Sequence, residues 1–230
     1  MAADKGKPKA AEARRSGAVM TRPTQAATMT GKAFERRNLV PAALDSRQRH
    51  RYRDYATWPD DERWELIDGV AYAMTPAPTL RHQTISLRLA AALLDLLKGG
   101  PCRVFAAPVD VLLPAGDEAD EAVDTVVQPD IVVVCRPERL GDKYICGAPD
   151  WIIEILSPST AKKDESLKRD RYERAGVKEY WLVHPTDRTV ARYRLDGGKY
   201  GRPDIYGEDD KVPVPTVPGA EIDLAAILAD

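Results

Sequence analysis

The sequence has few cysteines, and none of them is spaced like a metal-binding pair. Cys102, Cys135 and Cys146 are its three cysteines, and they form no C-x-x-C motif. An odd number at wide spacing argues against a disulfide framework and against a zinc knuckle. We therefore expect three ordinary thiols in a protein of the reducing cytoplasm.

Long apolar runs and nucleotide-binding motifs are missing too. No stretch approaches the roughly 18 apolar residues that span a bilayer, and the N-terminus lacks the apolar region of a secretory signal. There is no G-x-x-x-x-G-K, G-x-G-x-x-G or G-x-S-x-G motif, which argues against a P-loop, a dinucleotide-binding fold and a serine hydrolase. We expect no membrane contact and a cytoplasmic location.

Positive charge is concentrated in the first part of the chain. The formal net charge is -2, but residues 1–50 hold 11 Lys and Arg against 4 Asp and Glu, which leaves -9 on the other 180 residues. We interpret residues 1–48 as a disordered basic tail. Three roles for this tail stay open: a solvated extension, a contact for nucleic acid, or a transit peptide. Residues 49–230 are expected to form one domain.

Residues 49–230 alternate between apolar runs of strand length and longer helical patterns. Asp68-Gly69 stands between two apolar runs in 64–74, which predicts a hairpin. Apolar residues recur at helical spacing in 79–100, and a polar helix is expected at 159–176. The remaining expected elements are strands at 103–114, 125–135, 151–156 and 178–184, a closing hairpin at 189–200, and a short strand or helix at 222–228.

The order of these elements predicts an α/β fold. The helix at 159–176 joins two apolar strands, and such a crossover usually connects parallel neighbours. The hairpins at 64–74 and 189–200 imply antiparallel edges. The sequence therefore predicts a mixed β-sheet flanked by helices, with β-hairpins at the edges.

Two carboxylates interrupt otherwise apolar strands. Asp130 lies in QPDIVVV and Glu154 lies in WIIEIL, and a buried carboxylate is costly unless something compensates its charge. If the two strands are neighbours, the alternation of side chains lets both carboxylates converge at one end of the sheet. A divalent cation such as Mg²⁺, which prefers oxygen ligands, would relieve their repulsion. The alternative is that an Arg or a Lys pairs with each acid.

The helix that follows Glu154 carries a candidate cation. Asp164, Lys168 and Tyr172 are four residues apart, so they share one helical face. That face is expected to turn back over the end of the Glu154 strand, where Lys168 would activate water or stabilise charge at phosphorus. The alternative is an exposed, charge-laced helix, because other basic residues surround Lys168: Lys162, Lys163, Arg169, Arg171 and Arg174.

A series of longer motifs resembles a known family. In chain order they are WELIDG, LRHQ, QPDIVVV, GAPDWIIEILSPST, the D-x-x-x-K of 164–168, RYERAGVKEYWLV and a closing hairpin. They span residues 50–205 and are similar to those of the Uma-type restriction endonucleases, a family of predicted nucleases in the PD-(D/E)XK superfamily. The resemblance implies a restriction-endonuclease-like core and Mg²⁺-dependent hydrolysis of phosphodiester bonds, with Mn²⁺ as a substitute. It also implies nucleic acid, with DNA first, as the partner, and a homodimer.

Matched by position, the resemblance assigns roles to individual residues. Pro129-Asp130 supplies the PD motif and Glu154 supplies the second acid. Leu156 stands where the superfamily usually has its lysine, and Lys168 on the following helix is the candidate to replace it. Glu65, in WELIDG, matches a further catalytic acid that the superfamily often takes from an early element.

Four further positions complete the expected site. The carbonyl of Ile155 is expected to join the two strand acids in the metal shell. Tyr172, on the face of Lys168, and the pair His82-Gln83 at the start of the long helix are expected to contact substrate. The alternatives are a hairpin-edge acid for Glu65 and simple solvent exposure for His82-Gln83.

Other functions stay open at the level of sequence. Leu156 at the lysine position is compatible with a nuclease fold that has lost cleavage and only binds nucleic acid or a protein. The retained acids argue against this, because a pure binder gains nothing from buried carboxylates that face phosphate. A further alternative is an interaction protein whose contact is the basic tail at 1–48.

Overall fold

The chain is described by a computed structural model that covers residues 48–59, 61–74, 78–214 and 217–229. All of these residues belong to one compact unit, Pro41–Asp230. The basic tail expected at 1–48 falls almost entirely outside the described residues, so it stays a prediction.

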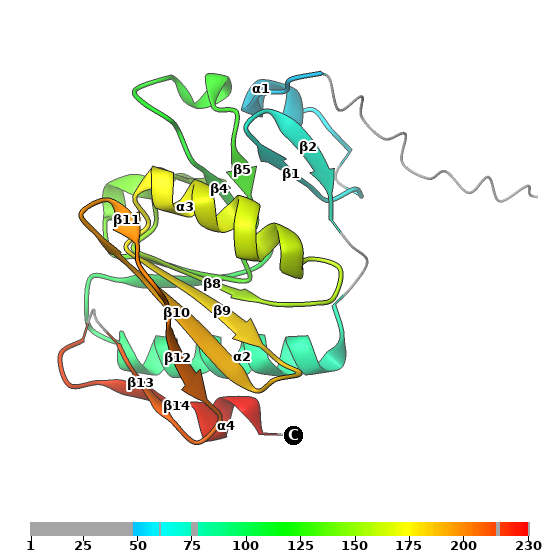
Figure 1. Cartoon of the computed structure of the whole chain (residues 1–230). Helices are drawn as coiled ribbons and strands as arrows, with labels where there is room; N and C mark the ends of the chain where they lie inside the picture. Colours follow the sequence, from blue (N-terminus) through cyan, green and yellow to red (C-terminus); the bar gives the residue numbers. More distant parts are fainter. Residues whose placement is uncertain (1–47, 60, 75–77, 215–216, 230) are drawn as a thin grey trace, which may run out of the picture. The chain divides into compact units, whose positions relative to one another are not determined.

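Two mixed β-sheets form the framework of this unit (Figure 1). The five-stranded sheet has the order β2 (Val70–Ala73), β1 (Trp64–Ile67), β5 (Val126–Val127), β4 (Asp110–Leu112) and β7 (Tyr144–Cys146). The seven-stranded sheet has the order β11 (Lys199–Tyr200), β10 (Thr189–Asp196), β9 (Glu179–His184), β8 (Trp151–Ile155), β6 (Ile131–Val134) and β3 (Arg103–Ala106), with β12 (Asp204–Gly207) also on β10. A separate pair is formed by β13 (Lys211–Pro213) and β14 (Glu221–Asp223).

The helices are short apart from α2. The α-helices are α1 (Tyr52–Tyr55), α2 (Leu80–Leu96), α3 (Arg169–Ala175) and α4 (Leu224–Leu228). The other helical segments are the 3-10 turns η1 (Asp120–Ala122) and η2 (Pro137–Arg139) and the π-helix η3 (Lys163–Lys168). Within the described ranges, none of these helices has the length and apolar character needed to cross a membrane.

Helices cover both faces of the larger sheet. On one face, Trp151, Ile153 and Ile155 of β8 pack with residues of α2 and α4. On the other face, Ile152 and Leu156 pack with residues of α3. Figure 1 shows α3 (yellow) and α2 (cyan to green) on these opposite sides. The predicted α/β fold with a mixed sheet flanked by helices is confirmed.

Local sequence signals position several elements as expected. The β1–β2 hairpin turns at Asp68 and Gly69, both with positive φ, which is the geometry that an Asp-Gly turn favours. Gly176 ends α3 in the left-handed conformation, where its N–H bonds to the last turn of the helix. The helix then leads into β9, which pairs in parallel with β8. The predicted crossover is therefore confirmed.

Two segments expected as single strands are each split between the two sheets. Residues 103–114 form β3 and β4, and residues 125–135 form β5 and β6. Each break contains a proline, Pro108 or Pro129. Proline has no N–H to donate to a ladder, so the chain leaves one sheet there and enters the other. The second break carries Asp130, one residue before β6.

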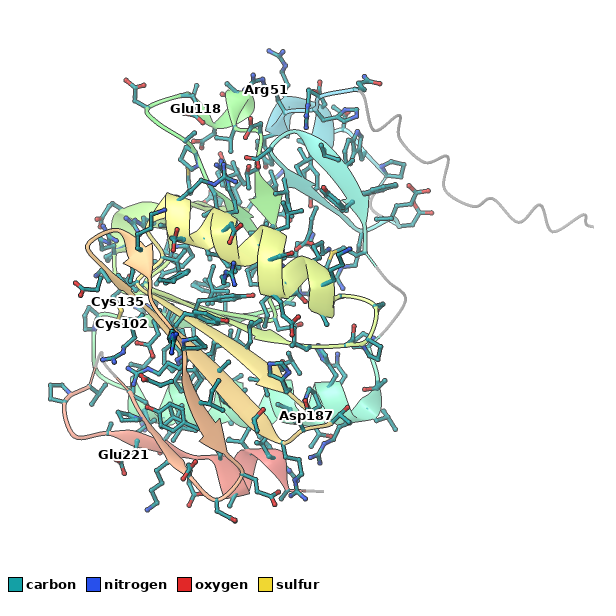
Figure 2. All side chains as sticks on the ribbon, viewed as in Figure 1. Arg51, Cys102, Glu118, Cys135, Asp187 and Glu221 are labelled. Carbon is teal, nitrogen blue, oxygen red and sulfur yellow. A yellow bond between two sulfur atoms is a disulfide. The ribbon has the colours of Figure 1, made fainter. Side chains whose placement is uncertain are left out.

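The expectation of three free thiols was wrong for two of them. Cys102 and Cys135 form a disulfide across a sequence separation of 33, while Cys146 is free. The β3–β6 register pairs Arg103 with Val134, so the next residue on each strand brings the two cysteines opposite one another. Figure 2 labels this pair beside the sheet. With a disulfide present, the cysteines no longer argue for a reducing compartment.

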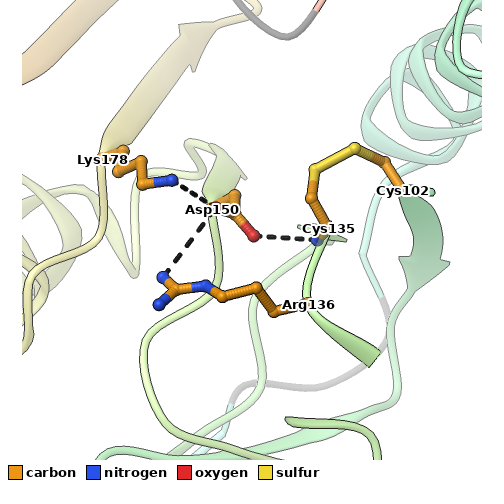
Figure 3. The surroundings of a disulfide bond; sticks show 5 residues. All are labelled: Cys102, Cys135, Arg136, Asp150 and Lys178. Carbon is orange, nitrogen blue, oxygen red and sulfur yellow. Dashed lines mark hydrogen bonds and ion pairs between the residues drawn. A yellow bond between two sulfur atoms is a disulfide. The ribbon is translucent and has the colours of Figure 1, made fainter. Parts of the chain in front are cut away.

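The disulfide is adjacent to an ion pair between the buried Asp150 and the exposed Lys178. The N–H of Cys135 donates to Asp150 Oδ2 at 2.8 Å, and Lys178 Nζ lies 2.8 Å from Asp150 Oδ1. Figure 3 shows Asp150 between Lys178, Arg136 and the backbone of Cys135. The start of β8 is thus tied to the end of β6, which holds the two acid-bearing strands side by side.

Candidate functional site: facing carboxylates and a buried lysine

The two strand acids predicted from sequence face each other. Strands β6 and β8 are antiparallel, with Ile131 opposite Ile153, and continuing this register by one residue sets Asp130 opposite Glu154. The carboxylate of Asp130 also accepts the N–H of Ile155 at 2.7 Å, taking the place of a backbone ladder bond. The predicted convergence at one end of the sheet is therefore observed.

Lys168 lies buried against Glu154. Its Nζ is 2.5 Å from Glu154 Oε1 and 3.5 Å from Asp164 Oδ1, and the residue is only 2% exposed. Tyr172, one helical turn later, donates its hydroxyl to the same Glu154 oxygen at 2.8 Å. The expected face of Asp164, Lys168 and Tyr172 therefore turns inward, and the alternative of an exposed Lys168 is excluded.

Glu65, on β1 of the smaller sheet, pairs with two lysines of η3. One of them, Lys168, also pairs with Glu154 on β8 of the larger sheet. Glu65 Oε1 lies 2.9 Å from Lys168 Nζ and accepts the N–H of Gln128 at 3.0 Å, while Glu65 Oε2 lies 2.5 Å from Lys163 Nζ. Glu65 is fully buried, so it is an internal anchor and not an exposed acid at a hairpin edge. We call Glu65, Glu154, Asp164, Lys163 and Lys168 the acid–lysine cluster.

Burial and neighbouring charge shift the pKa values of this cluster in opposite directions. Burial raises the pKa of Glu154 to about 8, with Lys168 acting against the shift and the nearby acids adding to it. Burial would also raise the pKa of Glu65, but Lys168 and Lys163 lower it to about 2. Burial alone would lower the pKa of Lys168, yet the surrounding carboxylates raise it well above its ordinary value. Lys168 therefore stays charged, and Glu65 is its permanent counter-ion.

His82 is positioned beside Asp130 by the start of α2. Thr79 caps the helix by accepting the N–H of His82 on its hydroxyl. The imidazole Nε2 lies 3.2 Å from Asp130 Oδ2, whereas Nδ1 is buried with no hydrogen-bond partner among the described residues. Burial acts to lower the pKa of His82, but Asp130 and the backbone of Ile155 raise it overall. Sequence-predicted His82 is therefore part of the site.

The site opens into a cavity of about 580 Å³, which we call the site cavity. Its lining includes the predicted residues Glu65, His82, Gln83, Asp130, Glu154, Ile155 and Lys168. Tyr172 is absent from the lining and is fully buried. Its expected contact with substrate therefore has no support here, and its observed contact is with Glu154.

The donor set fits the hard cation expected from sequence. Asp130 and Glu154 each use one carboxylate oxygen in the contacts above, and their other oxygens accept no hydrogen bond from any described residue. Within the described ranges no three His, Cys, Asp or Glu side chains are grouped as a metal cage. Two carboxylates and the Ile155 carbonyl match Mg²⁺, which keeps several waters and takes one or two protein carboxylates.

Sequence reasoning missed the role of Lys163. It was treated as a generic basic residue at the helix start, but its ammonium contacts Glu65. The segment 163–168 is a π-helix, with a wider turn than the α-helix that the four-residue spacing assumes. Five-residue spacing brings Lys163 and Lys168 to the same carboxylate. The sequence signal that could have revealed the contact between Lys163 and Glu65 is the basic residue five positions before Lys168.

Known proteins resemble this chain in fold and sequence. A crystal structure described as "a putative nuclease belonging to DUF820", from Anabaena variabilis, matches with a TM-score of 0.63 and 22% identity. The match covers 78% of this chain and 97% of that chain, and it shows that the fold is shared. "Uncharacterized protein slr1290" of Synechocystis sp. is 28% identical over 145 residues, which is 61% of this chain and 71% of the relative.

The family predicted from the motifs also matches directly. The family described as "Putative restriction endonuclease", Uma2, matches residues 52–225. This range contains both facing carboxylates, the buried lysine and Glu65, and its end at residue 225 lies beyond the segment 50–205 that carries the motifs. Because the match spans most of the folded unit and the solved neighbour shares its architecture, the chain belongs to the Uma2 family.

Proposed function

We propose that this protein is a metal-dependent endonuclease that hydrolyses phosphodiester bonds of nucleic acid, with DNA as the expected substrate. The observation that carries the proposal is Asp130 opposite Glu154, with the buried Lys168 Nζ 2.5 Å from Glu154. Family membership and the solved nuclease-like neighbour support the same reaction class. The expected cofactor is Mg²⁺, with Mn²⁺ as its substitute.

The residues of the site have different roles in the proposed reaction. Asp130, Glu154 and the Ile155 carbonyl would hold Mg²⁺, which supplies Lewis-acid polarisation of the phosphate and a more acidic bound water. Lys168 brings a fixed positive charge to the developing negative charge at phosphorus. Glu65 holds Lys168 in place, so Glu65 is a positioning residue.

Two further residues keep this arrangement fixed, and a third lies where substrate would bind. Tyr172 donates to Glu154 and stops its carboxylate from rotating. His82 holds the carboxylate of Asp130 from the other side. Gln83 lines the site cavity at the first turn of α2, where a substrate phosphate would meet backbone N–H groups and its amide.

The proposal is tested by cleavage of plasmid and short oligonucleotides with Mg²⁺, with Mn²⁺ and with chelator. The wild type is expected to cleave only with metal. Lys168→Ala should lower the rate by about 10² to 10³, the usual effect of losing one preorganised charge-stabilising contact. Lys143→Ala is the matched control, because Lys143 is exposed and lies outside both the acid–lysine cluster and the cavities beside it. Lys163→Ala is unsuitable as a control because Lys163 contacts Glu65.

The alternative is a protein of the same fold that binds nucleic acid or a protein without cleavage. Leu156 favours it, because this residue packs in the apolar core where the superfamily usually has its lysine. Metal-independent binding by the wild type, with no product from any substrate in either metal, would support the alternative. The buried Lys168 beside Glu154 favours the enzyme.

We further propose that two copies pair through α2. Leu80, Leu87 and Leu94 are 87%, 73% and 58% exposed, and they are seven residues apart, which aligns them along one helical stripe. An antiparallel pair centred on Leu87 sets Leu80 against Leu94 of the second copy. The same arrangement brings Asp95 near Arg81 of the second copy, whose guanidinium also donates to the carbonyls of Leu228 and Ala229.

Oxidative cross-linking tests this pairing, with Cys146→Ser as the background. Leu87→Cys is expected to cross-link with itself. Leu80→Cys and Leu94→Cys should cross-link when mixed but not alone. Light scattering should give a dimer mass for the wild type. A monomer mass at every concentration, or self-linking of Leu80→Cys, would contradict the proposal.

A further inference from the structure

A second cavity adjoins the site cavity. It has a volume of about 420 Å³ and lies between strand β2 and the first turns of η3, and we call it the side cavity. Its walls include the ring of Tyr72, and Met74 and Leu167 extend the apolar surface. Its volume is within the range of ordinary ligand sites.

The side cavity shares part of its lining with the site cavity. Met74, Ser159, Thr160 and Lys163 line both of them. Lys163 stands at the junction, because its Nζ is 2.5 Å from Glu65 Oε2 and 5.9 Å from the centre of the Tyr72 ring. A ligand that extends from one cavity into the other must pass this ammonium, whose side chain is 19% exposed.

The hairpin register explains why an aromatic ring lies here. Tyr72 on β2 is paired directly with Glu65 on β1. Side chains of paired residues stand on the same face of a sheet with their Cβ atoms about 4.5–5.5 Å apart. Tyr72 is therefore a neighbour of the acid–lysine cluster, and its ring borders the space beside the catalytic carboxylates.

The lining of the side cavity has a distinct chemistry. It combines an aromatic ring and apolar walls with the ammonium groups of Lys162 and Lys163 and the hydroxyls of Ser159 and Ser166. Its described lining contains no carboxylate, in contrast to the site cavity. A flat aromatic group that carries a negative charge and hydrogen-bonding edges satisfies all three features, and a nucleotide has this composition.

We propose that the side cavity binds the nucleotide next to the scissile phosphate, with its base stacked on Tyr72 and its phosphate near Lys163. A base enters such a cavity only when it is unpaired, because a paired base is stacked inside the duplex. The preferred substrate is therefore nucleic acid with an unpaired nucleotide beside the cleaved bond. This inference rests on the proposed nuclease function for the position of the scissile phosphate.

Binding without metal tests the inference independently of cleavage. Fluorescence anisotropy in EDTA compares a short labelled oligothymidine, an abasic strand of equal length and a blunt duplex. The oligothymidine should bind about 5- to 150-fold more tightly than the abasic strand, the range expected for stacking of one base. The blunt duplex should bind less tightly than the oligothymidine.

Variants of Tyr72 identify the stacking ring. Tyr72→Leu should remove most of the preference for bases over the abasic strand, and Tyr72→Phe should retain it. Tyr206→Leu is the matched control, because Tyr206 is a half-buried strand tyrosine outside the side cavity. Thermal unfolding of each variant checks that a lost preference does not come from lost folding.

The outcomes separate this inference from the proposed function. A base preference that depends on Tyr72, without cleavage in Mg²⁺ or Mn²⁺, supports the side cavity and overturns the endonuclease. If the wild type cleaves and Tyr72→Leu keeps the preference for bases, the nucleotide assignment of the side cavity is overturned and the proposed endonuclease function is unaffected. Equal binding of oligothymidine and the abasic strand by the wild type also overturns the nucleotide assignment. If Tyr72→Leu fails to fold, Tyr72→Phe provides the test. The proposal requires that Tyr72→Phe keep the wild-type preference for oligothymidine over the abasic strand, and loss of that preference overturns the stacking assignment.

Discussion

Lys168→Met is expected to destabilise the fold because three carboxylates share its ammonium. The Nζ atom lies 2.5 Å from Glu154, 2.9 Å from Glu65 and 3.5 Å from Asp164, and all four side chains are buried. Methionine has a similar length but no charge. Removing one partner of a buried ion pair costs about 3–5 kcal/mol, because the remaining charge is left without compensation.

Thermal and urea unfolding measure this effect. For a unit of this size, a loss of about 3–5 kcal/mol lowers Tm by roughly 6–20 °C. Lys162→Met, at an exposed position of the same helix, is the control and should stay within about 0.5 kcal/mol of the wild type. A double variant, Lys168→Met with Glu65→Gln, should recover part of the loss, because it removes one of the uncompensated carboxylates.

Added Mn²⁺ gives a second readout of the same cluster. In Lys168→Met the carboxylates lack their internal cation, so Mn²⁺ should raise Tm more than in the wild type. Saturation at about 100 times Kd stabilises a fold by about 2.7 kcal/mol. If Lys168→Met were as stable as Lys162→Met, and Mn²⁺ raised the Tm of both variants by the same amount, the reasoning that Lys168 compensates buried carboxylates would be refuted.

Three other predictions concern the metal, acid stability and the disulfide. Asp130→Ala should abolish Mn²⁺ binding in calorimetry, and an affinity equal to that of the wild type would contradict the assigned site. The pKa of Glu65 is lowered from 4.5 to about 2, so ionised Glu65 contributes about 3 kcal/mol to the free energy of unfolding above pH 4.5. This contribution is lost as the pH falls from 4.5 towards 2. In acid unfolding, the difference in free energy of unfolding between the wild type and Glu65→Gln should therefore become smaller over that range. Cys135→Ser should lower the free energy of unfolding by about 3–4 kcal/mol, as expected for a link across 33 residues, whereas Cys146→Ser should have little effect in urea titrations without reductant.

Strong local signals made much of the fold predictable. Asp68-Gly69 turns a hairpin because both residues tolerate positive φ. The four-residue spacing of Ile85, Leu89 and Leu93 gives α2 an apolar face, which packs on the larger sheet. These patterns depend on neighbours along the chain, so tertiary context was not needed to recognise them.

Breaks between sheets and the disulfide were not predictable in the same way. In a run such as 125–135, Pro129 marks the break, but nothing local says which sheet each half joins. The bond between Cys102 and Cys135 depends on the β3–β6 register, which pairs residues far apart in the chain. Pairing partners in a sheet are long-range information.

The candidate site was likewise predictable only in part. Apolar context and helical periodicity, which are local properties of the sequence, place Asp130 and Glu154 in apolar segments and Asp164, Lys168 and Tyr172 on one helical face. The contacts of Glu65 with Lys163 and Lys168, and the place of Tyr72 beside the site, emerge only from long-range packing. Those contacts join a hairpin of one sheet to a π-helix about a hundred residues later, and only the packing of the two sheets around the helix brings them within hydrogen-bonding distance.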